Sequence, residues 1–314
     1  VLHRLNPKVI LGGRMEIDEE AAYKAIEEKL AKPLGMSALD AARGIITVVN
    51  SNMARAIRVV SVERGYDPRE FVVVAFGGAG ALHAVNVAKD LGINKVMIPC
   101  NPGILCAVGL LVSDIRSDYV KTSIANFVPE NIDQMNENFK ELTDKGDAWL
   151  DDEKIDEEHK VIIRHADMRY YGQNFELSIE IPYKEITKDN IDEIRDLFHQ
   201  AHKREYGYCN EGALVQIVNY RATALGKVQT IELVEHPIEG PDASAAVIGK
   251  RDVYFEEAGE HVDTNIYNRD LIKAGNEVQG PAIIEQMDST IVVPPGHTAR
   301  ADRYLNLMIS YEAK

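Results

Sequence analysis

Apolar positions in the first part of the chain repeat at helical spacing over two stretches. Residues 18–32 predict a helix that begins at Asp18 and stops at Pro33 and Gly35. A second helix of about 27 residues, or roughly 40 Å, is predicted from the N-cap Ser37 to the region of Gly65. Its apolar residues recur close to every fourth position: Ile45, Val49, Met53, Ile57 and Val60. A helix of that length must cross a whole domain.

A strand, a helix and a second strand follow. The valine-rich run 71–76 is typical of a strand buried on both faces, as in parallel sheets. Residues 80–92 predict a helix and residues 94–99 the next strand, so the three form a right-handed parallel crossover unit. Residues 103–114 predict a buried helix, and residues 115–122 a strand that leaves it.

The pattern changes after about residue 122. Residues 129–150 predict an amphipathic helix, and alternating stretches broken by Gly, Pro, Asn and Asp then predict antiparallel strands. One helix, over 188–208, interrupts them. We therefore predict an α/β domain over residues 1–125 and a mainly antiparallel β domain with one or two helices over residues 126–314.

Composition narrows the class of protein. The chain has 314 residues, of which 45% are hydrophobic and 27% charged, as in soluble globular proteins. The longest apolar runs, such as 104–112, are shorter than the about 20 residues of a membrane span, and no signal-peptide pattern opens the chain. The net charge of −15 disfavours nucleic acid and anionic lipid. We expect neither nucleic acid nor membrane as a partner.

Two features concern the setting of the chain. Cys100, Cys106 and Cys209 form no metal-type pair and are odd in number, which favours a reducing, cytoplasmic location. The chain does not begin with Met, and we expect that a further segment precedes Val1.

The glycine-rich turn in VVVAFGGAGALHA, residues 72–84, is the main candidate for chemistry. It does not match the dinucleotide fingerprint, because His83 stands where the third glycine belongs and the next strand ends without an acidic residue. It does not match a P-loop, because no Lys-Ser/Thr pair follows the glycines. Two interpretations stay open: a tight turn, or a bare main-chain platform for a sugar or phosphate beside a helix N-terminus.

Other polar residues give weaker signals. We expect His83 to have a packing role, and His199 and His202 share a helix face but lack further metal ligands. Asp167 and Arg169 are expected to form a buried pair that braces a strand. There is no G-x-S-x-G elbow and no serine or cysteine triad, so no catalytic residue is assigned. The polar side of the long helix offers either a phosphate contact or salt bridges through Asn50, Asn52, Arg55 and Arg58.

Six segments of the sequence, listed below in chain order, together closely resemble the hydantoinase A / 5-oxoprolinase family. That family includes N-methylhydantoinase A-type subunits and related subunits of acetone and acetophenone carboxylases. The resemblance runs from Arg4 to about Leu307. The segments are RLNPKVILGGRMEID, NSNMARAIRVVSVERGYDPREFVVVAFGGAGALHA, PCNPGILCAVGLLVSDIRSD, DMRYYGQNFEL, HKREYGY and GPAIIEQMDSTIVVPPG.

The resemblance implies an ATPase core similar to those of sugar kinases, Hsp70 and actin, in which a nucleotide lies between two lobes. The segment FGGAG is similar to the family's adenosine-side loop. The resemblance therefore assigns nucleotide binding to Phe76, Gly77, Gly78, Ala79 and Gly80, with Ala81 adjacent. The family's second phosphate loop, an Asp-Gly-Gly-Thr-type hairpin, does not occur in this sequence. The chain therefore resembles the C-terminal part of a longer polypeptide.

The resemblance also implies an activity. Family members use ATP and Mg²⁺ to open cyclic amides of the hydantoin or 5-oxoproline type, with a B-type partner subunit in a hetero- or homo-oligomer. The alternative within the family is a subunit of an ATP-dependent ketone carboxylase. An alternative of another class is a non-catalytic assembly module, in which the glycine loop is only a turn. In each case we expect no ATP turnover by this chain alone.

Overall fold

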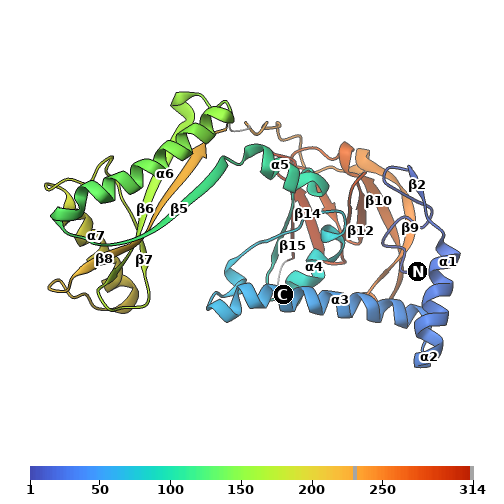
Figure 1. Ribbon diagram of the computed structural model, residues 1–314. Helices are drawn as coiled ribbons and strands as arrows, with labels where there is room; N and C mark the ends of the chain where they lie inside the picture. The colour runs from blue at the N-terminus through green and yellow to red at the C-terminus, as the bar shows by residue number, and fades with distance from the viewer. Residues whose placement is uncertain (229–231, 312–314) are drawn as a thin grey trace. The chain divides into compact units, whose positions relative to one another are not determined.

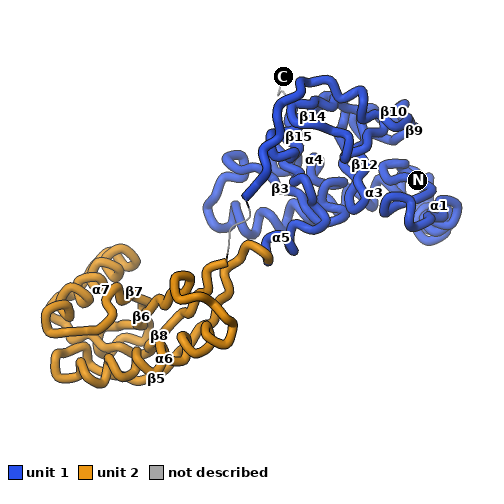
Figure 2. Tube along the Cα trace, turned by 90° about the horizontal axis from the view of Figure 1, so that it is seen from above, with its two compact units in different colours: residues 1–110, 232–314 blue, residues 111–231 orange. Residues whose placement is uncertain are grey.

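The chain folds into two compact units (Figure 2). Unit 1 contains residues 1–110 and 232–314, and unit 2 contains residues 111–231. The structure is a computed structural model and describes residues 1–228 and 232–311. The units do not follow the predicted continuous ranges 1–125 and 126–314. The reason is that the last part of the chain returns to unit 1 and pairs with its strands.

The N-terminal part of unit 1 is a short hairpin followed by helices. Its elements are β1 (Val9–Ile10), β2 (Met15–Glu16), α1 (Glu19–Ile26), a π-helical turn (Glu27–Ala31) and α2 (Lys32–Leu34). The predicted helix start is confirmed, because the Asp18 carboxylate accepts the N–H of Ala21 at 2.8 Å. The helix includes Pro33, however, and ends at Gly35.

The long predicted helix is α3 (Ala38–Val60), and it runs along one side of unit 1 (Figure 1). Its cap is confirmed, since the Ser37 hydroxyl accepts the N–H of Asp40 at 3.0 Å. Few of its residues are buried. Within the described residues, the span Ala38–Arg64 is the one helix that is long and apolar enough to cross a membrane. A single helix of this kind is weak evidence for a membrane-spanning segment.

The parallel pairing and the connecting helix of the predicted crossover unit are confirmed, with one correction. Strands β3 (Val73–Val74) and β4 (Lys95–Ile98) pair in parallel, with α4 (Gly80–Asp90) between them in sequence. Strand β3 is short and lies at an edge of its sheet, and Val74 is 42% exposed. The prediction of a strand buried on both faces is therefore wrong, because apolar residues alone do not reveal what covers them.

Helix α5 (Leu105–Val112) is the predicted third apolar segment, but it is not buried. None of its residues is buried, and Leu110 is 78% exposed. The prediction of a helix is right and the prediction of burial is wrong.

The C-terminal part of unit 1 forms seven strands. They are β9 (Val247–Phe255), β10 (Glu260–Asn268), β11 (Glu277–Gln279), β12 (Ala282–Glu285), β13 (Thr290–Val293), β14 (His297–Ala301) and β15 (Leu307–Tyr311). One sheet has the order β13-β12-β10-β9 and the other the order β11-β14-β15-β4-β3. Strand β15 runs antiparallel to β4 with Ile309 opposite Val96, so the end of the chain completes a sheet that its first hundred residues begin.

Helix α4 contributes to the core of unit 1 together with both sheets. Its small residues Ala81, Ala84 and Ala88 are buried and belong to the same apolar cluster as Ile291 and Ile309. Because these side chains are short, the helix can approach strands from both sheets closely. The C-terminal strands therefore help to fix α4 and the loop that precedes it.

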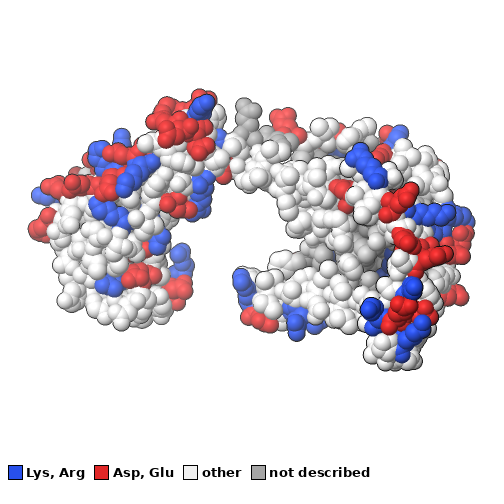
Figure 3. Space-filling view, turned by 45° about the vertical axis from the view of Figure 1, so that its right-hand side comes forward, with Lys and Arg blue, Asp and Glu red and all other residues white. Residues whose placement is uncertain are grey.

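Unit 2 is an antiparallel sheet with two helices. Its elements are β5 (Ile115–Asn126), α6 (Ile132–Asp152), β6 (Lys160–Tyr170), β7 (Leu177–Glu180), α7 (Ile191–Tyr206) and β8 (Val215–Gly226), in sheet order β5-β8-β6-β7. The predicted amphipathic helix is α6, whose Met135 and Phe139 are buried in the unit's core. Charged side chains gather on its outer side (Figure 3), where Lys140 pairs with Asp144 at 2.6 Å.

Asp167 of β6 is buried, but its partner is not the predicted Arg169. Its carboxylate accepts hydrogen bonds from Arg221, at 2.8 Å, and from Asn219, at 2.9 Å, both on β8. Asn219 stands directly opposite Asp167, and cross-strand neighbours meet more closely than residues two apart on one strand. Arg169 pairs instead with Glu176.

We predict that Asp167 makes unit 2 sensitive to acid. Burial acts to raise the pKa of the Asp167 carboxyl, but the hydrogen bonds from Arg221 and Asn219 lower it below its usual value. A lowered folded-state pKa gives stability that is present above the unfolded pKa of about 3.9 and is lost as the pH falls towards the folded value. Asp167→Asn should therefore lower the free energy of unfolding by about 1–3 kcal/mol at pH 7. The free energy of unfolding of this variant should also depend less on pH below pH 5.

Trp149 of α6, the chain's only tryptophan, reports this unfolding by fluorescence in denaturant titrations at several pH values. Asp189→Asn, at an exposed position, is the matched control and should follow the wild type. Coincident pH slopes for Asp167→Asn and the wild type would rule out this role.

Candidate functional site

The glycine-rich loop links β3 to α4 and is held by backbone hydrogen bonds. The N–H of Ala75 donates to the Met97 carbonyl at 2.9 Å, and the N–H of Gly77 donates to the Pro102 carbonyl at 2.7 Å. Gly77 has φ of +78°, a conformation that side chains with Cβ rarely adopt. The loop needs glycine at this position for its own geometry, whatever it binds.

Helix α4 begins at Gly80 without a side-chain cap. Ala79 occupies the N-cap position, and the first turn contains no acidic residue. The first N–H groups of a helix lack partners within the helix, and the positive end of the helix dipole lies there. This end of α4 therefore suits electronegative atoms of a ligand.

A turn from the C-terminal part of the chain, residues 286–289, lies against the glycine loop. A Cβ at Gly78 would come within 3.4 Å of the Asp288 carbonyl oxygen. The Asp288 carboxylate accepts the N–H of Gly103 at 3.0 Å, and the Gln286 amide donates to the Cys100 carbonyl at 2.9 Å. Residues far apart in the sequence therefore build one wall together.

The loop and this turn line a pocket of about 630 Å³. That volume lies within the range of about 300–1,000 Å³ for small-molecule sites. The β1–β2 hairpin, residues next to it and the β10–β11 connection contribute further residues, and single residues of α4, β9, β12 and β13 complete the lining. The lining residues are Leu5, Asn6, Val9, Ile10, Leu11, Gly12, Gly13, Gly78, Ala79, Leu82, Ile248, Asn268, Asp270, Glu285, Gln286, Met287, Asp288, Ser289 and Thr290.

Two polar atoms of the turn lack partners. The Gln286 side-chain oxygen and the Ser289 hydroxyl are buried and have no hydrogen-bond partner among the described residues. Buried polar groups in proteins are almost always paired, with protein, water or ligand. The oxygen of Gln286 and the hydroxyl of Ser289 are therefore free to form hydrogen bonds with a polar group of a ligand next to the glycine loop.

The charge of the pocket favours an uncharged part of a ligand. Asp270, Glu285 and Asp288 are in its lining. Glu285 is paired with Arg251 at 2.9 Å, and no Lys or Arg belongs to the lining. Carboxylates repel phosphate, so the pocket suits a nucleoside better than its phosphates.

The described residues provide no cluster of three or more His, Cys, Asp or Glu that could hold a metal ion. Mg²⁺ is usually held by one or two carboxylates together with substrate phosphates and water. The described residues therefore do not form a magnesium site made of protein ligands alone.

The six residues assigned by resemblance differ in their position. Gly78 and Ala79 are exposed and line the pocket, and Gly77 is half-buried beside them. Phe76 is 49% exposed and is not in the lining. Gly80 opens the helix, whereas Ala81 is fully buried in the core, so its side chain is unavailable to a ligand.

The three histidines that the sequence singled out are buried, and His83 has the packing role predicted for it. His83 is buried, and its Nδ1 lies 2.8 Å from Oδ1 of Asn50. Burial, and next the positive charge of Arg4, lower the pKa of His83, so it is neutral near pH 7. In unit 2, His199 and His202 are buried, and the Nδ1 of His199 lies 2.8 Å from the Tyr170 hydroxyl.

The polar residues of α3 that the sequence singled out separate in the structure. Asn50 is buried against His83, and Arg58 donates to the Asp90 carbonyl at 2.9 Å. Asn52 and Arg55 are exposed. None of the four lines the pocket beside the glycine loop.

Sequence reasoning missed the turn that covers the loop. Gln286, Asp288 and Ser289 lie in the segment GPAIIEQMDSTIVVPPG, which the resemblance includes but to which it gave no role. A polar turn between two apolar strands was the available signal. Its distance in sequence from Gly77 gave no reason to join the two.

Gly103→Ala should disturb the wall that the turn and the loop share. A Cβ at Gly103 would lie 2.2 Å from the Asp288 carboxylate oxygen, so Asp288 must shift. This shift should lower the free energy of unfolding by about 1–3 kcal/mol. Thermal unfolding measures this loss. Gly44→Ala, in α3 with open space around it, should instead stabilise by about 0.5–1 kcal/mol. Adding Asp288→Gly, which removes all three Asp288 side-chain atoms that this Cβ would meet, should recover most of the stability lost by Gly103→Ala; a strictly additive double variant would contradict this contact.

Comparisons with known proteins cover nearly the whole chain. The sequence profile of the family described as Hydantoinase/oxoprolinase matches residues 1–119, and that of the Hydantoinase/oxoprolinase C-terminal domain matches residues 125–311. Caprolactamase subunit alpha of Pseudomonas jessenii is 34% identical over 93% of this chain and 42% of its own length. The chain thus spans about two fifths of that relative.

Two solved structures are also similar. The nucleotide-free structure of acetone carboxylase, from work on ATP-dependent acetone carboxylation, matches with a TM-score of 0.89 and 26% identity over 99% of this chain and 45% of that chain. The ATP-dependent caprolactamase from Pseudomonas jessenii matches with a TM-score of 0.71 and 33% identity over 99% of this chain and 46% of that chain.

Proposed function

The chain belongs to the hydantoinase/oxoprolinase family, and on this basis we propose that it is the C-terminal portion of an ATP-dependent subunit that opens cyclic amides. The observation that carries the proposal is the pocket between the glycine loop and the 286–289 turn. It combines bare main chain at Gly78, an uncapped helix N-terminus and two buried polar atoms without partners.

The pocket's role in this proposal is to hold the nucleoside end of ATP. Leu82 and Met287 offer apolar surface for a base, and Gln286 and Ser289 offer polar atoms for the base or ribose. The phosphates and Mg²⁺ would lie towards the part of the subunit that this chain lacks. The absence of an Asp-Gly-Gly-Thr hairpin from the sequence supports this division.

The chemistry follows from the weak reactivity of an amide. A lactam carbonyl is a poor electrophile, and phosphoryl transfer from ATP to its oxygen would make a centre that water can attack. Mg²⁺ would screen the charge of the phosphates during that step. In this proposal the described residues contribute binding and orientation of ATP, and no catalytic group is assigned to them.

A ketone carboxylase is the second function that a specific observation favours. Acetone carboxylase is the structural match with the higher TM-score of the two described above. In that case the hydrolysis step is replaced by attack of an activated enol on CO₂ or carboxyphosphate. Product analysis with hydantoin, 5-oxoproline, caprolactam and acetone, on the complete subunit with its partner, distinguishes the two.

Exposed apolar residues on three elements support a covering partner. They include Val48 of α3 (61% exposed), Val74 of β3 and Leu110 of α5. Large apolar side chains that stay exposed commonly mark an interface where they gather in one patch. We propose that the remainder of the subunit covers these residues of unit 1. We also propose that the subunit assembles in the cytoplasm, with a B-type subunit in a hetero-oligomer or with further copies of itself in a homo-oligomer. The cysteines, all free, accord with a reducing compartment.

The nucleoside proposal predicts which part of ATP this chain recognises. By calorimetry, adenosine, ADP and MgATP should bind with dissociation constants within tenfold of one another, about 1.4 kcal/mol, because the chain contacts the shared nucleoside. Ala79→Leu should weaken the binding of all three ligands tenfold or more, because the larger side chain fills the pocket. Ala22→Leu, at an exposed position of α1, is the matched control. No binding of any of the three would favour the assembly module, in which the loop is only a turn.

The exposed apolar surface predicts self-association of the isolated chain. Sedimentation velocity should detect a concentration-dependent shift to larger species that Val74→Thr with Leu110→Gln reduces, with little change in melting temperature. Tyr171→Ser, which replaces a residue of unit 2 that is 69% exposed, should leave association unchanged. A chain that stays monomeric at all concentrations would contradict an unsatisfied interface on unit 1.

A further inference from the structure

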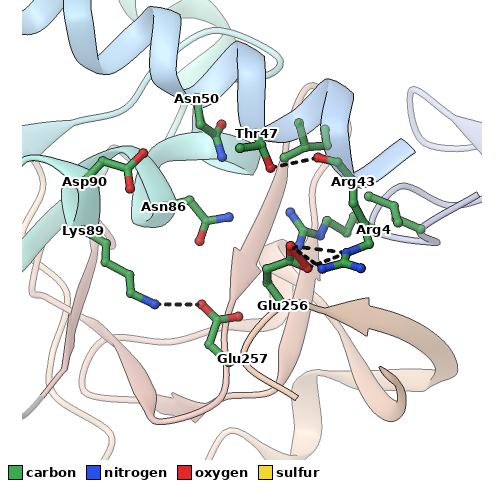
Figure 4. A pocket seen from close by; sticks show the side chains of 11 residues that line it. Arg4, Arg43, Thr47, Asn50, Asn86, Lys89, Asp90, Glu256 and Glu257 are labelled. Atoms are coloured by element: carbon green, nitrogen blue, oxygen red, sulfur yellow. Dashed lines mark hydrogen bonds and ion pairs between the residues drawn. The ribbon is translucent and has the colours of Figure 1, made fainter. Parts of the chain in front are cut away.

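A second pocket of unit 1 lies near the carboxyl end of α4, whereas the glycine loop precedes the amino end. Its walls come from α3, α4, the turn after β9 and the first residues of the chain (Figure 4). Its volume of about 240 Å³ is below the usual range for drug-sized ligands, so it suits a small molecule.

Arg4 is the feature of this pocket that needs a partner. Its side chain is in the lining, although the residue is only 8% exposed. Its Nε donates to the Tyr254 carbonyl at 3.3 Å. Within residues 1–228 and 232–311, its terminal nitrogens have no hydrogen-bond or ion-pair partner. Burial lowers the pKa of the Arg4 guanidinium, and the nearby charges of Glu257 and Glu256 offset this only in part. An anion bound to its terminal nitrogens would supply the remaining compensation.

Two amide side chains face the same space. Asn50 of α3 is buried and its oxygen contacts His83, which leaves its amide nitrogen towards the pocket (Figure 4). Asn86 of α4 is half-buried and has no side-chain partner among the described residues. Together with Arg4 they offer neutral and charged donors to one ligand.

The remaining charges select the anion. Arg43 is bound to Glu256 at 2.8 Å, and Lys89 lies 3.5 Å from Glu257 (Figure 4). Arg4 is thus the one cation of the lining without a partner within 4 Å. Three carboxylates in the lining, including Asp90, disfavour a doubly charged phosphate. A planar carboxylate with a single charge matches the guanidinium fork.

We propose that this pocket binds a small monocarboxylate. Its carboxylate group would lie on the terminal nitrogens of Arg4 and the amides of Asn50 and Asn86, and its alkyl part on Leu2 and Ile46. The inference does not rest on the proposed function, because none of these residues belongs to the glycine loop or the 286–289 turn.

The test is a titration of the 314-residue chain with sodium propanoate at constant ionic strength. Calorimetry gives the affinity, and the NMR signals of the arginine Nε–H groups report the site. We expect saturable binding with a dissociation constant of about 1 mM or lower, and inorganic phosphate at least tenfold weaker.

Two variants locate the site. Arg4→Gln removes the charge, and Asn86→Asp adds a carboxylate of the same shape at a half-buried position. Each should weaken the binding of propanoate at least tenfold. Asn52→Asp adds the same charge at an exposed position of α3 outside the pocket and should bind as the wild type. If Arg4→Gln fails to fold, Asn86→Asp still decides.

Three results would overturn the proposal. No saturable signal at tens of millimolar propanoate would remove the site. Propanoate binding unchanged by Asn86→Asp and by folded Arg4→Gln would place it elsewhere. Phosphate binding as tightly as propanoate would overturn the assignment to a carboxylate.

Discussion

The pairing of β15 with β4 is the constraint on which unit 1 depends. Residues Leu307 and Ile309 stand opposite Ile98 and Val96, so the two strands join segments that lie about two hundred residues apart in the sequence. Because β15 takes one side of β4 and β3 the other, the chain must return to unit 1 after forming unit 2. That return brings the 286–289 turn onto the glycine loop and creates the pocket.

This arrangement changes how the glycine loop is understood. Gly77 is required by its backbone conformation, whereas a Cβ at Gly78 would lie 3.4 Å from the Asp288 carbonyl oxygen, close to an ordinary contact. Gly77 therefore has a structural reason to be glycine, and Gly78 leaves the main chain bare beside the pocket. A tight turn and a ligand platform are therefore compatible descriptions of one loop. What favours a ligand is the wall opposite, where Gln286 and Ser289 keep buried polar atoms without partners. The carboxylates of that wall point to an uncharged portion of the ligand.

Local signals in the sequence predicted local structure well. The Ser37 cap, the crossover of β3, α4 and β4, and the buried face of α6 follow from residues within one or two turns of each other. Predictions failed where a distant neighbour decides. The apolar runs of β3 and α5 did not reveal that these elements are exposed, and Asp167 bonds across the sheet to Arg221 instead of to Arg169. The 286–289 half of the pocket was missed for the same reason.

The most direct test of this account is backbone hydrogen exchange of the chain with and without saturating adenosine, read by mass spectrometry. A wall built from two distant segments predicts slower exchange in both residues 77–82 and residues 286–290, with residues of unit 2 unchanged. Protection of neither segment at saturation, or protection confined to other parts of the chain, would contradict the claim that the returning strands and the glycine loop form one nucleoside site.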